Sequence, residues 1–219
     1  EPVRILKNSL IVQEGEKITE KHLAQLEALG FLGPRVNTSG YIGLFLLLAA
    51  LYVIIILYLY FFNEEIWDNI THLALLSLIV VLTLIFGLAG RYFSIYLMPI
   101  AMGSILITIL FNWRLAIFMN IILSLLLGFI VDGEFSLTVI TLLGGLIAVY
   151  SVSRLQRRSD LAKAGLYVAV VNMALIVATF LLFKGFQLQY EYLREFSVSM
   201  LAGIGSGFFS AVMAIGLLP

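Results

Sequence analysis

The stretch RLQRRSDLAK, residues 154–163, holds four of the chain's thirteen Lys and Arg residues and separates two long apolar runs. Short loops rich in Lys and Arg stay on the cytoplasmic side during membrane insertion, because moving cationic residues across the bilayer is costly. The loop is therefore predicted to set the orientation of the whole chain. Its basic residues are Arg154, Arg157, Arg158 and Lys163.

The composition on either side of this loop indicates an integral membrane protein. Apolar residues make up 62% of the chain and charged residues 12%, with a mean hydropathy of +1.07. Soluble domains are only about half apolar and about a quarter charged. The formal net charge is zero, which gives no reason to expect nucleic acid as a partner. The chain has no Cys, so disulfides, thiolate nucleophiles and Cys-ligated metals are excluded.

Seven apolar segments are predicted to span the membrane, because a spanning helix needs about 20 mainly apolar residues. The predicted fold is an all-α bundle of seven transmembrane helices that forms one domain, residues 40–219. Pro99 is expected to kink the third helix, with neighbouring polar groups satisfying the carbonyl that it frees. The segments cover residues 40–62, 70–89, 95–111, 115–131, 137–153, 164–183 and 198–218.

Seven spans with the basic loop inside place the N-terminus outside and the C-terminus in the cytoplasm. Arg114 on the inside agrees with this orientation. Three scattered basic residues on the outside do not, and the density of charge in the basic loop outweighs them. These residues are Arg91, Lys184 and Arg194.

Residues 1–39 differ from the rest and are predicted to form a short α+β stub of a larger extracellular sensor domain. Ile5–Val12 has the composition of a strand. Thr19 is placed to cap a helix with leucines at a spacing of three, which Gly30 would end. One strand and one short helix cannot bury a core of their own. The chain is accordingly expected to be an excised piece of a longer protein, and the alternative is a complete small membrane protein with a processed N-terminus.

The residues that could carry chemistry are few. His22 and His72 have no ligand partners at suitable spacing, and no charged residue lies in the central part of any predicted span, although proton relays and ion pathways depend on such residues. The sequence therefore predicts no catalytic site, metal or cofactor for this chain. Asn120 and Asn172 are the polar residues at depth, and hydrogen bonding to another helix is favoured over contact with a ligand.

The predicted seventh helix has one face made of small residues. At about 100° per residue, eight of them fall within one half of the helix surface. Such a face allows close approach of another helix, and it serves either static packing or a low-cost shift that relays a signal. The residues are Ser199, Ala202, Gly203, Ser206, Gly207, Ser210, Ala211 and Ala214.

Three stretches together resemble the seven-transmembrane HD hydrolases, the PgpH-like bacterial phosphodiesterases of cyclic di-AMP. LIVQEGEKITEKHLAQLEALGFLG (10–33) is similar to the end of that family's extracellular domain. MPIAMGSILITILFNWRLAIFMNIILSLLLGFI (98–130) is similar to its third and fourth spans, and RLQRRSDLAKAGLYVAVVN (154–172) to its basic loop and sixth span. The order and spacing of these stretches carry the resemblance, which covers nearly the whole chain.

The resemblance implies a multi-pass protein of the bacterial plasma membrane, with the N-terminus outside and a cytoplasmic HD domain that hydrolyses cyclic di-AMP at a two-metal site. No catalytic residue of that domain can be carried over to this chain, which ends at Pro219. The chain would then anchor the hydrolase and relay a signal. Expected partners are membrane lipids and the HD domain in cis, with an extracellular ligand and a second copy of the chain as further candidates.

Two other functions are open on the sequence. A small transporter or substrate-binding membrane subunit could hold an apolar ligand without buried charges, and solute uptake in vesicles would identify it. A structural subunit that assembles with other membrane chains would co-purify with a stable partner.

Overall fold

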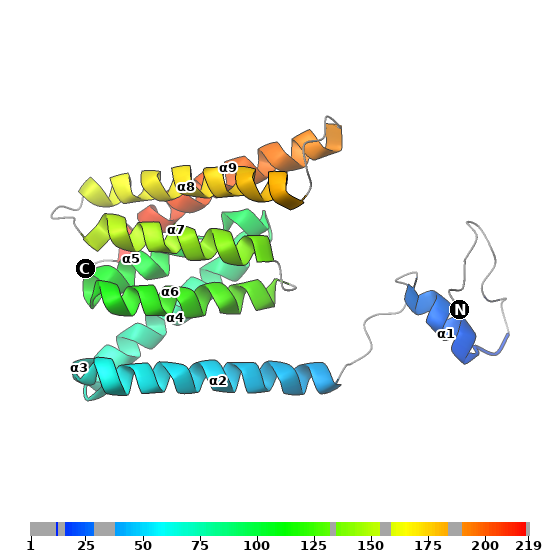
Figure 1. Ribbon diagram of the computed structural model, residues 1–219, viewed down its shortest axis with the longest axis horizontal. Helices are drawn as coiled ribbons and strands as arrows, with labels where there is room; N and C mark the ends of the chain where they lie inside the picture. The colour runs from blue at the N-terminus through cyan, green and yellow to red at the C-terminus, as the bar shows by residue number, and fades with distance from the viewer. Residues whose placement is uncertain are drawn as a thin grey trace. The chain divides into compact units, whose positions relative to one another are not determined.

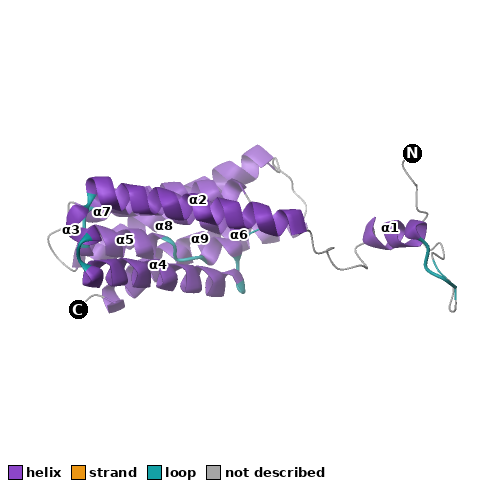
Figure 2. Ribbon diagram, turned by 90° about the horizontal axis from the view of Figure 1, so that it is seen from below, coloured by secondary structure: helices purple, strands orange, loops and turns teal. Residues whose placement is uncertain are grey.

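The computed structural model describes Val12 and residues 16–28, 38–131, 135–153, 159–183 and 190–217. All regular elements in these ranges are helices (Figure 2). The chain divides into two compact units, Glu1–Tyr58 and Leu59–Pro219. The predicted strand lies outside the described residues except for Val12, which has no regular structure.

The first unit contains α1 (Glu20–Ala28) and most of α2 (Thr38–Phe62). The helix predicted after Thr19 is present as α1, and the Thr19 hydroxyl caps its start by accepting a 3.4 Å hydrogen bond from the backbone N–H of His22. α2 has 25 residues, a length of about 37 Å, which is enough to cross a bilayer.

The second unit is a helical bundle (Figure 1). Its elements are α3 (Glu64–Trp67), α4 (Ile70–Arg91), the 3₁₀ turn η1 (Ile95–Leu97), α5 (Ala101–Leu110), α6 (Trp113–Ile130), α7 (Phe135–Ser153), α8 (Ser159–Phe183) and α9 (Tyr190–Leu217). Within the described ranges of the whole chain, six helices are long and apolar enough to cross a membrane: α2, α4, α6, α7, α8 and α9. The protein is therefore a multi-pass membrane protein.

The third predicted span, residues 95–111, is not one continuous helix, which corrects the sequence analysis. Its regular helix is α5, with ten residues and a length of about 15 Å. Pro99 interrupts the segment because it has no backbone N–H and its ring collides with the carbonyl four residues earlier. The backbone instead makes the turn η1, capped by the Ser94 hydroxyl, and becomes α-helical from Ala101.

Residues 92–112 nevertheless carry the chain from one end of the bundle to the other. Near the start of α4 the His72 ring packs edge-on against Phe111, with ring centroids 6.0 Å apart. At the end of α4 the Arg91 guanidinium donates a 3.2 Å hydrogen bond to the carbonyl of Ile130, the last residue of α6. α4 and α6 therefore run in the same direction, and the interrupted segment returns between them.

The interrupted segment is also the centre of the bundle. α5 contacts α4, α6, α7 and α9, and its residues 101–107 are all buried. Non-helical backbone at membrane depth is tolerated only where protein covers it. Met98 and Ile100 on either side of Pro99 are 2% and 1% exposed, so the break meets this condition.

α9 begins earlier than predicted, at Tyr190 instead of residue 198. The apolar run marks only the part of a helix that lies in hydrocarbon, whereas Glu191, Arg194 and Glu195 extend α9 by about two polar turns. Two residues of this extension are anchored on the bundle: the Tyr192 and Phe196 rings lie 5.9 and 5.3 Å from the Phe180 ring of α8.

Candidate functional site

Asn120 connects three helices in the interior of the bundle. Its side-chain Oδ1 accepts a 3.0 Å hydrogen bond from the Ser104 hydroxyl of α5, and its Nδ2 donates a 2.9 Å bond to the Leu142 carbonyl of α7. Asn120 and Ser104 are fully buried. The amide packs on Gly145, where a Cβ atom would overlap Asn120 Oδ1. The structure thus gives Asn120 the hydrogen bonds to other helices that the sequence analysis favoured.

Asn172 lies against Gly144, the neighbour of Gly145 in α7, but its side-chain oxygen has no hydrogen bond to another helix in the described protein. It projects from α8 toward Gly144 of α7, where a Cβ atom would overlap its Oδ1. The residue is 5% exposed, and its Oδ1 has no hydrogen-bond partner among the described residues. Gly144 and Gly145 therefore provide room for two amides that approach from different helices, and only one of the two is fully bonded within the protein.

All eight residues of the small face of α9 are buried, and bulky residues such as Leu201 and Val212 on the opposite side are exposed. The partner of the small face is mainly α8. A Cβ atom at Gly207 would lie 2.5 Å from the Ala169 backbone nitrogen and 2.7 Å from the Gly165 carbonyl oxygen. Backbone thus meets backbone at this point, because there is no side chain between the two helices.

The same face of α9 reaches the break in the third segment. The Ser206 hydroxyl donates a 2.6 Å hydrogen bond to the Met98 carbonyl, and both groups are buried. The Met98 carbonyl also accepts a 2.9 Å hydrogen bond from the Ile100 backbone N–H, so Ser206 supplies this buried carbonyl with a second donor, from a neighbouring helix. The role of Ser206 as that donor was not predicted.

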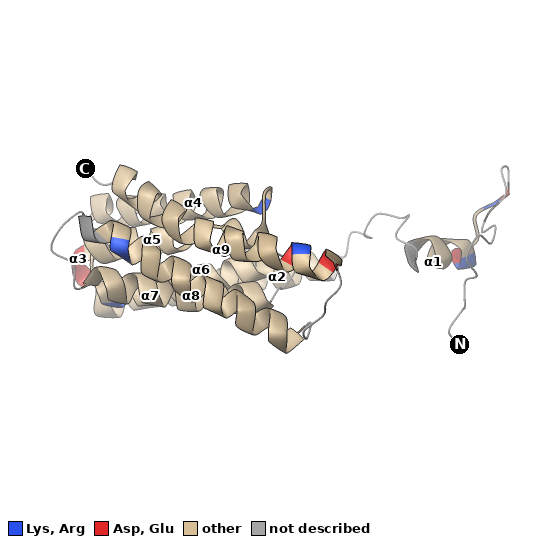
Figure 3. Ribbon diagram, turned by 90° about the horizontal axis from the view of Figure 1, so that it is seen from above, with Lys and Arg blue, Asp and Glu red and all other residues tan. Residues whose placement is uncertain are grey.

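The charged residues of the described bundle lie at its two ends (Figure 3). Arg114 and Lys163 are close to the starts of α6 and α8, which share one end with α3 (Figure 1). Of the basic loop, Lys163 belongs to α8, and the other three basic residues lie outside the described residues.

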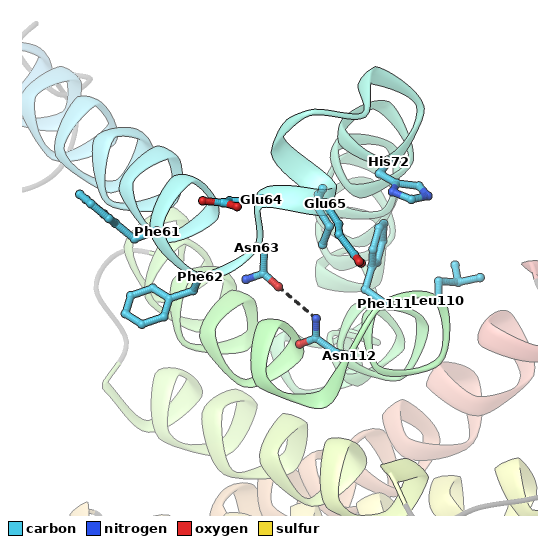
Figure 4. Close-up of a pocket in the computed structure, with 10 residues that line it drawn as sticks. Phe61, Phe62, Asn63, Glu64, Glu65, His72, Leu110, Phe111 and Asn112 are labelled. Carbon is cyan, nitrogen blue, oxygen red and sulfur yellow. Dashed lines mark hydrogen bonds between the residues drawn. The ribbon is translucent and has the colours of Figure 1, made fainter.

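A pocket of about 550 Å³ opens at the α3 end of the bundle (Figure 4). Asn112 Nδ2 donates a 3.1 Å hydrogen bond to Asn63 Oδ1 there, which ties the turn before α3 to the turn before α6. Glu64, Glu65 and His72 line the pocket and are exposed. No group of three or more His, Cys, Asp or Glu side chains placed to hold a metal occurs among the described residues.

The sequence analysis identified the small face of α9 but missed the residues that meet it. Gly165 and Ala169 of α8 are small residues four apart, the spacing that lets two helices approach closely in lipid. This spacing is visible in the sequence. The spacing alone did not identify α8 as the partner of α9, because small residues at a spacing of four also occur in α9 itself.

Comparison with known proteins places these helices in a wider group. Residues 38–219 match the sequence model of a family described as "7TM receptor with intracellular HD hydrolase". The chain is 29% identical over 230 residues to the cyclic-di-AMP phosphodiesterase PgpH of Bacillus subtilis (strain 168), covering 99% of the chain and 32% of that protein. It is 26% identical over 227 residues to the cyclic-di-AMP phosphodiesterase PgpH of Listeria monocytogenes serotype 1/2a (strain 10403S), covering 100% of the chain and 31% of that protein.

The chain thus spans about a third of the length of these curated relatives. No solved structure matches it significantly.

Proposed function

The chain belongs to the family of 7TM receptors with an intracellular HD hydrolase, and we propose that it is the membrane-anchoring and signal-relay module of a cyclic-di-AMP phosphodiesterase. The observation that carries the proposal is the close contact of α9 with α8, in a chain that aligns along its whole length with about a third of two such phosphodiesterases. In this proposal, hydrolysis takes place in an HD domain of the full-length protein and not within the helices described here.

The proposed module crosses the membrane seven times, with residues 92–112 as an interrupted third crossing. Support comes from the parallel course of α4 and α6, whose matching ends are joined by the contacts of His72 with Phe111 and of Arg91 with Ile130. A chain that runs in the same direction twice must return between the two passages. The buried break at Pro99 is the kind of irregular backbone that a membrane bundle tolerates.

The proposed orientation places the α3 end of the bundle in the cytoplasm. This end of the bundle contains the starts of α4, α6 and α8 and the end of α9 (Figure 1). If one of these helix ends lies in the cytoplasm, the others do too. The basic loop between α7 and α8 favours the cytoplasm, and the family's description as a receptor with an intracellular hydrolase supports the same assignment. The start of α9 would then face outward.

The relay would act through movement of α9 along α8. Interfaces of small residues lack interlocking side chains, so a helix can shift over them at low cost. The Ser206 hydrogen bond to Met98 would hold one position of α9, because sliding α9 would break it. A change on the outer side could in this way alter the position of the cytoplasmic end of α9.

The relay can be tested by Gly203→Ala in the full-length phosphodiesterase. A Cβ atom at Gly203 would meet the Cδ1 end of the Ile176 side chain, which can yield more easily than backbone. The expected result is a changed rate of cyclic di-AMP hydrolysis with an unchanged unfolding temperature. The matched control is Val212→Leu on the exposed side of α9, which should change neither. An unchanged rate for Gly203→Ala would favour a static bundle and contradict the relay.

A further inference from the structure

A narrow crevice runs beside the break in the third segment. It is lined by Met98 and Ala101 of that segment, Thr141 and Gly144 of α7, Asn172 of α8 and Ser206 of α9, among others. Its volume is about 10 Å³, which is at the lower limit of the roughly 10–15 Å³ that holds one water molecule. The crevice therefore accepts a ligand of a single heavy atom.

The hydrogen-bonding chemistry of the crevice calls for a donor. Ser206 and Thr141 use their hydroxyl protons in bonds to the carbonyls of Met98 and Thr138, so toward the crevice their oxygens can only accept. Asn172 Oδ1 is also an acceptor, and it is buried without a partner in the described protein. A buried acceptor that stays unpaired costs about 1–3 kcal/mol. Three acceptors lining one small space favour an occupant that can donate two protons.

We propose that one water molecule is bound in this crevice as a fixed part of the bundle, and that it donates a hydrogen bond to Asn172 Oδ1. A water molecule carries two donor protons, and the hydroxyl oxygens of Ser206 and Thr141 are the acceptors available for the second. A small cation would also suit three oxygens. However, Met98, Ala101, Thr141, Gly144, Asn172 and Ser206 are all uncharged, and taking a bare ion out of water without a counter-charge costs several kcal/mol.

The water gives Asn172 Oδ1 a hydrogen bond that the described protein does not supply by itself. It joins α8, through Asn172, to the cluster of polar groups at which α9 meets the third segment. Asn120 provides an internal contrast. Its Oδ1 and Nδ2 are both bonded to protein groups, so it needs no water.

Water-edited solid-state NMR of the ¹⁵N-asparagine-labelled protein in lipid bilayers tests the proposal. The Asn172 side-chain amide should receive magnetisation from water about as quickly as that of exposed Asn69, and faster than that of Asn120. Asn172→Leu assigns the signal. Ala101→Val, which fills the crevice without removing a hydrogen-bonding group, should abolish the rapid transfer to Asn172.

Transfer to Asn172 as slow as transfer to Asn120 would overturn the proposal, and this comparison within the unmodified protein does not depend on how any variant folds. Persistent rapid transfer in a folded Ala101→Val variant would also overturn it, because the water would then lie elsewhere. Replacing sodium chloride by choline chloride should leave the Asn172 signal unchanged. A shift of that signal on replacement would identify the occupant as a cation and reject water.

Discussion

The Ser206 hydroxyl of α9 donates a 2.6 Å hydrogen bond to the carbonyl of Met98, a residue 108 positions earlier in the chain. Met98 directly precedes Pro99 and lies at the break between η1 and α5 in the third apolar segment. The same carbonyl accepts a 2.9 Å hydrogen bond from the Ile100 backbone N–H, so Ser206 is its second donor and the one that comes from another helix. The bond from Ser206 also fixes the position of α9 relative to the centre of the bundle.

Ser206→Ala should lower the unfolding free energy of the protein in detergent by about 1 kcal/mol, because one buried hydrogen bond between helices is lost and the Met98 carbonyl keeps only its bond from the Ile100 backbone N–H. Thermal or denaturant unfolding followed by circular dichroism measures the change. The matched control is Ser197→Ala, since Ser197 is exposed on the same helix and bonds only the Leu193 carbonyl of its own preceding turn. Equal effects of the two substitutions would contradict the role of Ser206.

Gly207→Ala should destabilise the bundle by about 1–3 kcal/mol, the usual cost of inserting a methyl group into a closely packed interface. The new Cβ would lie 2.5 Å from the Ala169 backbone nitrogen, so the two helices would have to separate. Gly216→Ala in α9 is the control, because a Cβ there meets nothing within 4 Å. Its unfolding midpoint should stay the same or rise slightly, owing to the higher helix propensity of Ala. If both variants behaved alike, the close contact with α8 would be refuted.

Asn120→Ala and Ser104→Ala should be coupled in a double-mutant cycle. Each side chain is the hydrogen-bond partner of the other across α5 and α6, so removing the second should cost less once the first is gone. A coupling energy of about 0.5–1.5 kcal/mol is expected from such bonds between membrane helices. Ser104→Ala combined with Ser197→Ala serves as the uncoupled control, and additivity of the Asn120 pair would reject the interaction.

Cysteine labelling should place the two ends of the bundle on opposite sides of the membrane. The chain contains no native Cys. In the variants Ser159→Cys, at the start of α8, and Glu191→Cys, at the start of α9, all thiol labelling of the chain therefore comes from the introduced residue. Only Glu191→Cys should react with a membrane-impermeant thiol reagent added to intact cells, and Ser159→Cys should react only after the cells are opened. Reaction of Ser159→Cys in intact cells would invert the proposed orientation.

The sequence alone predicted properties that each segment carries by itself. Membrane helices were found because the length and apolar content of a segment are local quantities, set by the thickness of the hydrocarbon layer. The small face of α9 was found for a similar reason, since helical periodicity can be read from one stretch of residues. The same local rules failed where a helix leaves the hydrocarbon, as at Tyr190, or loses regularity within it, as at Pro99.

Only the tertiary structure decided which residues from distant segments meet. It placed Ser206 on Met98, Asn120 on Ser104 and Gly207 on Gly165 and Ala169. In lipid, apolar side chains gain nothing by turning inward, so hydropathy does not distinguish a lipid-facing surface from a helix contact. The choice of partner depends instead on backbone approach and on single hydrogen bonds between residues far apart in the chain. It was fixed only when the helices packed together.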